Sequence, residues 1–291
     1  MTEIVDKAVH QNKPIHRLTL EYEMETHGTP KGQIISEINK RIAIMYTAAK
    51  EGVSKPVVTK SGLVSGNAYK FFHAIGKNKL LSPVVNKAVA YSLAVAEVNA
   101  AMGIIVAAPT AGSCGVIPGA LFSLHEEIDK SEEKLVNGFL TASGVGLYIA
   151  NKATFAASVA GCAAEIGAST CMAAATITEF LGGTPKQAVH AGAIALKSYM
   201  GLACDPVAGL VEVPCIKRNA IGVSNAFTAS QMALNGVESA IPFSEVIDAM
   251  YRIGKNLPVE LRETSKGGLA KSPTGIRAAQ KINNCAIHPP L

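Results

Sequence analysis

Tryptophan is absent from this chain of 291 residues, and aromatic residues make up only 5% of it. Charged residues are also scarce, at 17%, whereas 48% of the residues are hydrophobic and the mean hydropathy is +0.25. Intrinsic disorder requires the opposite balance, so the composition excludes it. A β-sandwich needs aromatic and β-branched faces that this chain largely lacks. The many alanines and glycines instead indicate helices that approach one another closely.

Uninterrupted apolar runs of membrane-spanning length are missing too. The two longest apolar tracts, 88–110 and 144–181, contain polar residues such as Glu97 and Glu165, and a spanning helix needs about 20 apolar residues with few or no charges. The N-terminal MTEIVDKAVHQNK is charged and has no apolar centre, unlike a secretory signal. We therefore expect a cytoplasmic protein without a membrane partner, whose cysteines stay reduced or bind metal.

No basic stripe is present either. The net charge of +5 comes from 27 basic and 22 acidic residues, but the basic residues are scattered and their densest group is Lys217-Arg218. Because nucleic-acid-binding proteins gather Lys and Arg on one face, we expect no nucleic-acid partner.

Helical signals cover most of the chain. Apolar residues recur at helical spacing in 33–50, and 243–255 is amphipathic. Ser82 and Thr184 each stand before a proline, the pattern of an N-cap followed by Pro at the first helical position. Ser131 precedes two acids that favour a first helical turn. We therefore expect an all-α fold of packed Ala/Gly-rich helices whose Gly/Pro loops form the active site.

No repeat or linker divides the chain. We expect one compact domain with an N-terminal helical segment (1–60), a core (61–275) and a C-terminal tail (276–291). Four glycine-rich junctions separate the helices, at 60–66, 108–115, 204–209 and 266–270. Such loops expose backbone N–H groups and suit a small anion, although each can also be a plain turn between helices.

The six cysteines are Cys114, Cys162, Cys171, Cys204, Cys215 and Cys285. None belongs to a CxxC pair, which excludes zinc ribbons and thioredoxin-like motifs. Three widely spaced cysteines can still meet in space, and three thiolates leave one corner of a metal or cluster open, as in catalytic sites. Buried apolar cysteines are the alternative interpretation.

Helix geometry sorts two of these cysteines. Cys162 and Cys171 are nine residues apart, so on one helix they point to opposite sides. If Cys162 faces a site, Glu165 lies beside it and Cys171 packs in the core. Cys114 stays open as a ligand, a nucleophile or a packing residue.

Other catalytic patterns are missing from the sequence. It contains no G-x-S-x-G, Walker A, G-x-G-x-x-G after a strand, or HExxH motif. Lys60 and Lys197 can in principle hold pyridoxal phosphate, but nothing singles either out. Lys217-Arg218-Asn219 follows Cys215 closely, where a cation can hold a carboxylate or simply be solvated.

Three segments together carry a resemblance to a known family. They are VAAPTAGSCGVIPG at 106–119, GCAAE at 161–165 and CDPVAGLVEVPCIKRNAIG at 204–222. They resemble the α chain of the bacterial iron–sulfur L-serine dehydratases (L-serine ammonia-lyases), and the resemblance runs from about residue 61 to 275.

The resemblance implies a [4Fe–4S] cluster held by Cys162, Cys204 and Cys215, with one iron free for substrate. That iron acts as a Lewis acid on the hydroxyl of L-serine, which loses water and is deaminated to pyruvate and ammonia without pyridoxal phosphate. Such a lyase belongs to amino-acid catabolism and gluconeogenesis.

The resemblance also indicates where the substrate binds. It assigns one loop to the serine carboxylate, namely Thr110, Ala111, Gly112, Ser113 and Cys114. Lys217, Arg218 and Asn219 are further contacts of the carboxylate or of the cluster surroundings. Ser61 and Gly62 form a third wall.

Two departures from the family pattern affect the interpretation. Single-chain members carry a preceding α/β domain with a Ser-Ser-His-Thr motif that this sequence lacks. We therefore expect an α subunit that works with a β subunit as an αβ pair, the catalytic base coming from the partner's histidine.

The tail is the second departure. Cys285 is a candidate regulatory ligand of the free iron, or else a free surface thiol.

The alternatives to a dehydratase are an L-cysteine desulfidase and a non-catalytic metal-binding helical scaffold.

Overall fold

The computed structural model describes residues 4–59 and 61–287, without the side chains at 283 and 285–287. Lys60 and the side chain of Cys285 therefore lie outside the described residues. The helices are α1 (Ile4–Gln11), α2 (Ile15–His27), α3 (Lys31–Ser54), α4 (Asn67–Phe72), α5 (Pro83–Ala100), α6 (Val116–Glu127), α7 (Glu132–Lys152), α8 (Ala157–Ala160), α9 (Ile166–Phe180), α10 (Pro185–Lys197), α11 (Cys215–Leu234), α12 (Phe243–Lys255) and α13 (Pro273–Ile287). Five 3₁₀ turns join them: η1 (Ala111–Ser113), η2 (Gly161–Ala163), η3 (Val207–Gly209), η4 (Val259–Leu261) and η5 (Gly268–Lys271). These described residues contain no strand, which confirms the all-α prediction.

The capping residues named from the sequence begin their helices. The side chains of Ser82, Ser131 and Thr184 each accept a hydrogen bond from the backbone N–H three residues on. Thr184 also forms a reciprocal capping box with Gln187, so two N–H groups at this end of the helix are satisfied.

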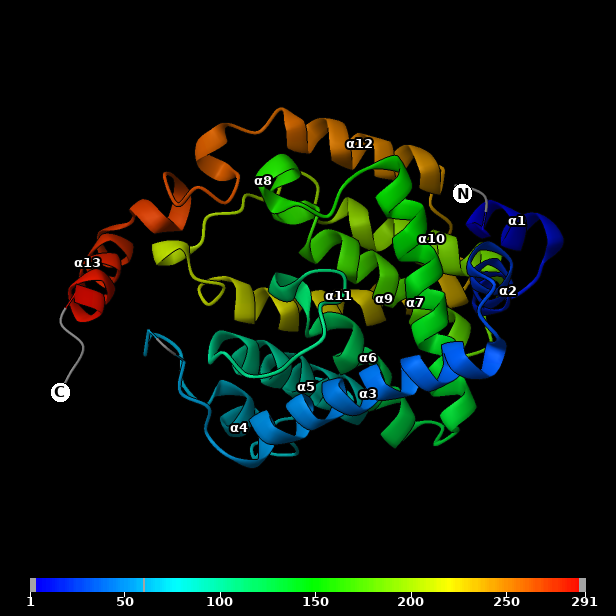
Figure 1. Ribbon diagram of the computed structural model, residues 1–291, viewed down its shortest axis with the longest axis horizontal. Coiled ribbons are helices and arrows are strands. Elements are labelled where there is room, and N and C mark those ends of the chain that lie inside the picture. The colour runs from blue at the N-terminus through cyan, green and yellow to red at the C-terminus, as the bar shows by residue number, and fades with distance from the viewer. Residues whose placement is uncertain (1–3, 60, 288–291) are drawn as a thin grey trace.

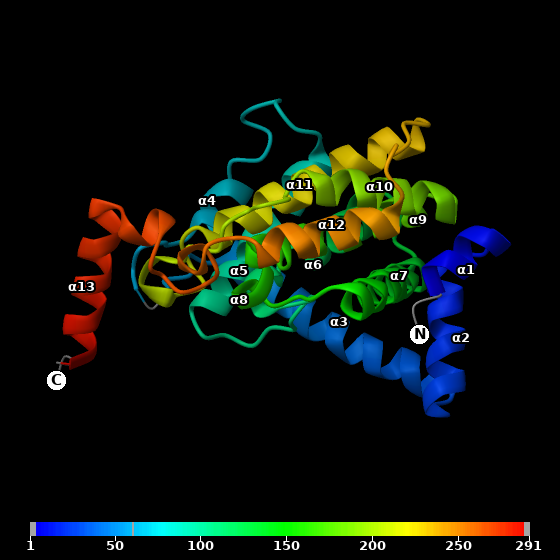
Figure 2. The same cartoon turned by 90° about the horizontal axis from the view of Figure 1, so that it is seen from above.

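Helix α9 is the centre of the molecule. It packs between α7, α10 and α11, as Figures 1 and 2 show, and every one of its residues except Glu179 is buried. Glycines let the neighbours approach: a Cβ at Gly192 of α10 would lie 3.1 Å from the Cys171 Sγ, and one at Gly222 of α11 would lie 2.8 Å from the Thr170 Oγ1. The abundance of small residues thus produces close helix packing.

Two acids that interrupt the apolar tracts, the buried Glu97 and the half-buried Glu179, cap distant helices. Glu97 of α5 accepts hydrogen bonds from the backbone N–H groups of Asn67 (2.7 Å) and Ala68 (3.1 Å) at the start of α4. Glu179 accepts one from the Ile15 N–H (2.6 Å) at the start of α2. A carboxylate at a helix N-terminus is stabilised by the helix dipole, which explains these charges inside apolar helices.

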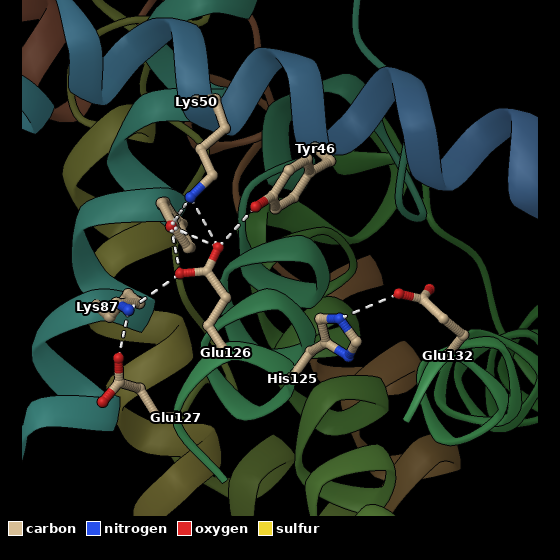
Figure 3. A network of polar contacts seen from close by, with 8 residues as sticks. Tyr46, Lys50, Lys87, His125, Glu126, Glu127 and Glu132 are labelled. Atoms are coloured by element: carbon tan, nitrogen blue, oxygen red, sulfur yellow. Dashed lines mark hydrogen bonds and ion pairs between the residues drawn. The ribbon is translucent and has the colours of Figure 1, made fainter. Parts of the chain in front are cut away.

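A polar network joins α3, α5 and α6 (Figure 3). The half-buried Glu126 of α6 accepts hydrogen bonds from the Lys50 Nζ of α3 at 2.7 Å and from the Tyr91 hydroxyl of α5 at 2.8 Å, and it pairs with Lys87 at 3.0 Å. Burial alone would raise the pKa of Glu126, but its hydrogen bonds lower that pKa to about 2.

Among the described helices, none alone combines the length and apolarity needed to cross a bilayer. Only α8 with η2, taken together with α9, passes such a test, and this pair is bent by 54°.

Candidate active site

Cys162 lies in η2, the turn that precedes α9, and not on the same helix as Cys171. Gly161 has a φ of 69°, in the left-handed region, and breaks the helix there. The single helix assumed in sorting the two cysteines is therefore wrong. Cys171 nevertheless packs in the core, in the middle of α9 against Gly192, while Glu165 lies beside Cys162 as expected.

Cys204 is held by backbone pairing with a segment far along the chain. Its N–H donates to the Leu261 carbonyl and its carbonyl accepts from the Glu263 N–H, both at 2.8 Å. Cys162 in turn donates its N–H to the Leu202 carbonyl at 2.8 Å. Cys215 is the first residue of α11. Three separate segments thus bring the three thiols to one end of the molecule.

The thiols form a buried group with one carboxylate. The Sγ atoms of Cys162 and Cys204 and a carboxylate oxygen of Glu165 lie within 4.8 Å of one another. Cys215 is also buried, and it lies close enough to Cys162 for the charge of Cys162 to raise its pKa. None of the three forms a disulfide. Such a donor set can hold a metal.

The electrostatics of this group favour a thiolate at Cys162. The Cys204 thiol donates a hydrogen bond to Cys162, and together with the charge of Arg218 this lowers the pKa of Cys162 despite its burial. The same hydrogen bond raises the pKa of Cys204. Burial, followed by the negative charge at Cys162, raises the pKa of Cys215 to about 12. Arg218 is the cation that stabilises the site.

The three polar residues that follow Cys215 and Ile216 differ in their contacts and burial. Arg218 donates to the Ala203 carbonyl (2.8 Å) and to an Asp205 oxygen (3.1 Å), and it contacts Cys162. Asn219 is buried, and its amide bonds only to backbone groups. Lys217 is exposed on α11. Of the three, the structure brings Arg218 to the thiols.

The 110–114 loop faces Glu165. A Cβ on Gly112 would lie 3.0 Å from a Glu165 carboxylate oxygen, so a larger residue would require the carboxylate to shift. The Thr110 hydroxyl donates a hydrogen bond to Glu165 and lies 3.0 Å from the Ser113 hydroxyl. Cys114 is fully buried, and its thiol faces the Val95 carbonyl at 3.9 Å, so it packs in the core beside α5.

Ser61 and Gly62 are brought to the cysteine loop by Glu212. This buried carboxylate accepts hydrogen bonds from the hydroxyls of Thr59 and Ser61 and from the Val64 N–H at 2.9 Å. Gly62 has a φ of 69° in this turn. Glu212 was not singled out from the sequence, although it lies inside the cysteine segment 204–222.

Two more residues anchor the loops: Asp205, which was not singled out from the sequence, and Asn219, which was expected as a substrate contact. Asp205 accepts the Leu269 N–H at 2.8 Å and so holds the fourth glycine-rich junction. Asn219 joins the Gly112 carbonyl to the Cys215 carbonyl, at 2.8 and 2.9 Å. The described parts of all four junctions therefore meet around the thiols. Helix α13, which contains Cys285, packs against η3 and η5 of the same loops, at the left in Figure 1.

The chain was compared with known proteins. A family model described as "Serine dehydratase alpha chain" matches residues 10–270. The chain is 45% identical over 286 residues to the "Probable L-serine dehydratase, alpha chain" of Bacillus subtilis (strain 168), which covers 98% of this chain and 95% of the relative.

Two further relatives are also named as L-serine dehydratases. The "L-serine dehydratase, alpha chain" of Peptoniphilus asaccharolyticus is 42% identical over 274 residues, 94% of each chain. The "L-serine dehydratase" of Haemophilus influenzae (strain ATCC 51907 / DSM 11121 / KW20 / Rd) is 44% identical over 183 residues, 62% of this chain and 40% of the relative. With matches of this extent, and with its cysteines gathered at one end of an all-α fold, the chain belongs to the serine dehydratase alpha chain family.

Proposed function

We propose that this chain is the cluster-bearing α subunit of an L-serine dehydratase, which converts L-serine to pyruvate and ammonia in the cytoplasm. The observation that carries the proposal is the convergence of Cys162, Cys204 and Cys215 beside Glu165 and Arg218, in a chain of this family. The reaction is a step of amino-acid catabolism that feeds gluconeogenesis.

The three cysteines fit a [4Fe–4S] cluster by the chemistry of the donor set. They are buried thiols from three segments, free of disulfides, beside a guanidinium that offsets thiolate charge. Three ligands leave one iron open, and when bound the cluster supplies a Lewis acid for the serine hydroxyl. No pyridoxal phosphate takes part.

The loops of the chain bind and orient the substrate. The 110–114 loop meets the serine carboxylate with backbone N–H groups, and Asn219 fixes this loop relative to Cys215. The Ser61–Gly62 turn, held by Glu212, forms a further wall. Elimination of water gives aminoacrylate, which hydrolyses to pyruvate and ammonia.

A partner completes the enzyme. The family name contains "alpha chain", and the Haemophilus influenzae relative is much longer than the part this chain matches. A β subunit supplies the base that removes the Cα proton, forming an αβ pair. Cys285 would be a regulatory ligand for the open position of the cluster.

The test is anaerobic purification of the chain with its β subunit, followed by analysis of iron, sulfide and the visible spectrum before and after addition of L-serine. About four iron and four sulfide per α chain are expected for a [4Fe–4S] cluster, with a spectral change on serine and release of pyruvate. Zinc or no metal would overturn the cluster. Sulfide release from L-cysteine without pyruvate release from L-serine would identify a desulfidase.

A further inference from the structure

Three carboxylates belong to the segments that carry the thiols, namely Glu165, Asp205 and Glu212, and two of them are already paired within the protein. Asp205 pairs with Arg218 and accepts the Leu269 N–H. Glu212 accepts two hydroxyls and one N–H. Both are already paired with donors of the protein, so the third carboxylate, Glu165, is the one to examine.

Glu165 has no cationic partner. Within the described ranges 4–59 and 61–287, no Lys, Arg or His side chain forms an ion pair with it, and its charged neighbour is another acid, Glu263. The Thr110 hydroxyl donates to it, yet one neutral hydrogen bond is a small compensation for a largely buried carboxylate. Such a group is stabilised when a cation enters beside it.

The position of Glu165 is suited to a ligand of the site. A carboxylate oxygen lies within 4.8 Å of the Sγ atoms of Cys162 and Cys204, and a Cβ built on Gly112 would lie 3.0 Å from the same carboxylate. The carboxylate is therefore placed between the metal-binding thiols and the loop that meets the substrate carboxylate.

The hydroxyls of the loop do not supply Glu165 with a cation. Thr110 interacts with the Glu165 carboxylate, and its hydroxyl lies 3.0 Å from the Ser113 hydroxyl. Both hydroxyls are neutral, so a charged donor beside Glu165 is still lacking. The backbone N–H groups of the loop can then serve the substrate carboxylate, and Glu165 can accept from a substrate cation.

We infer that Glu165 binds the ammonium group of the substrate and restricts the site to 2-amino acids. This inference rests on the proposed function. A zwitterion with carboxylate, ammonium and hydroxyl then has a separate partner for each group: the 110–114 loop, Glu165 and the open metal position. A hydroxy acid without the amine leaves Glu165 unpaired.

The experiment compares L-serine with 3-hydroxypropanoate, which keeps the hydroxyl and carboxylate but lacks the ammonium. The iron-loaded protein with its β subunit is prepared as wild type and as Glu165→Gln. The KM for L-serine and the inhibition constant of 3-hydroxypropanoate are measured, together with iron content. A hydrogen bond between charged groups predicts that Glu165→Gln raises the KM for serine about 10- to 100-fold, while the constant for 3-hydroxypropanoate changes less than about threefold.

If the variant does not turn over serine, calorimetry gives both dissociation constants directly, and the same change in their ratio is expected. Glu260→Gln is the matched control, because it removes an exposed acid from η4 beside Cys204. Glu165→Asp, which keeps the charge, should recover part of the discrimination.

Equal weakening of both ligands, or an unchanged KM, would overturn the role of Glu165. Loss of iron from Glu165→Gln would also overturn it, because Glu165 would then be a metal ligand. A wild-type protein that holds iron but does not convert serine would instead refute the proposed function, so the two failures are distinguishable.

Discussion

The Asn219 amide donates one hydrogen bond to the Gly112 carbonyl at 2.8 Å and another to the Cys215 carbonyl at 2.9 Å, and its oxygen accepts from the Gly115 N–H at 2.9 Å. One buried side chain thus connects the loop near Glu165 to the helix that begins with a cysteine. The relative position of the two depends on an uncharged group that never needs to touch the substrate.

Replacing this residue tests the connection. Asn219→Ala leaves two carbonyls and one N–H without this partner, and we expect a loss of about 2–4 kcal/mol in the free energy of unfolding, with weaker iron retention. Urea denaturation under anaerobic conditions measures the free energy of unfolding. Asn225→Ala is the control on the same helix, because its buried Oδ1 accepts no hydrogen bond from the described residues. Equal losses in both variants would contradict the anchoring role.

Cysteine variants test the ligand set. Cys204→Ser and Cys215→Ser should each abolish the iron–sulfur absorbance, because a serine hydroxyl replaces a thiolate ligand. Cys171→Ala should leave the absorbance nearly intact, since Cys171 is buried in α9 against α10. Iron and sulfide analysis of the anaerobically purified variants gives the answer. Equal iron loss from Cys171→Ala would show that the assignment of ligands is mistaken.

Glu212 should control the order of the Ser61 turn. Glu212→Gln keeps a single acceptor oxygen for three donors, so we expect faster amide hydrogen exchange over residues 61–65, by about 10-fold or more. Mass spectrometry with hydrogen exchange localises the effect. The exposed Glu260→Gln serves as control, and unchanged exchange in Glu212→Gln would refute the anchor.

The Glu126 network predicts a dependence of stability on acid. Because the folded pKa of Glu126 is lowered to about 2 from 4.5, its contribution is complete above about pH 4.5 and is lost as the pH falls toward 2. After allowance for solvent screening we expect about 1–2 kcal/mol. Unfolding free energies at pH 6 and pH 3 should differ less in Glu126→Gln than in the wild type. Parallel pH profiles would contradict this contribution.

Cys285 is tested by the time course of activity. If it occupies the open position before serine arrives, Cys285→Ser should remove any lag that precedes full turnover. A lag of unchanged length in the variant would rule out this ligation. Serine-dependent progress curves after anaerobic dilution provide the measurement.

Local signals were sufficient for the helices but not for the site. An N-cap side chain bonds to a backbone N–H only three residues on, so helix starts can be predicted from a short stretch of sequence. The starts at Ser82, Ser131 and Thr184 were predicted in this way. The break before α9 was not predicted, because Gly161 is one small residue in an Ala/Gly-rich tract whose pattern is typical of a continuous helix. Periodicity alone cannot show where such a tract bends.

The anchors of the loops were missed for a different reason. Ser61 and Glu212 are 151 positions apart, and Gly112 and Asn219 are 107 apart. No spacing rule connects such positions, since their contact is created by the packing of helices around α9. The resemblance directed attention to the cysteine segment 204–222, but it did not say which of its polar residues hold the neighbouring loops.

The pairing of Cys204 with residues 261 and 263 affects how the protein is made. During synthesis, the three thiols emerge from the ribosome well before Leu261, which accepts from the Cys204 N–H, and Leu269, whose N–H donates to the Asp205 carboxylate. The growing chain therefore carries three unpositioned thiols until the segment after α12 has been translated. A metal that binds to the formed site, as proposed above, would therefore enter only after residues 261–269 have been synthesised, and a chain truncated before them would lack a formed site.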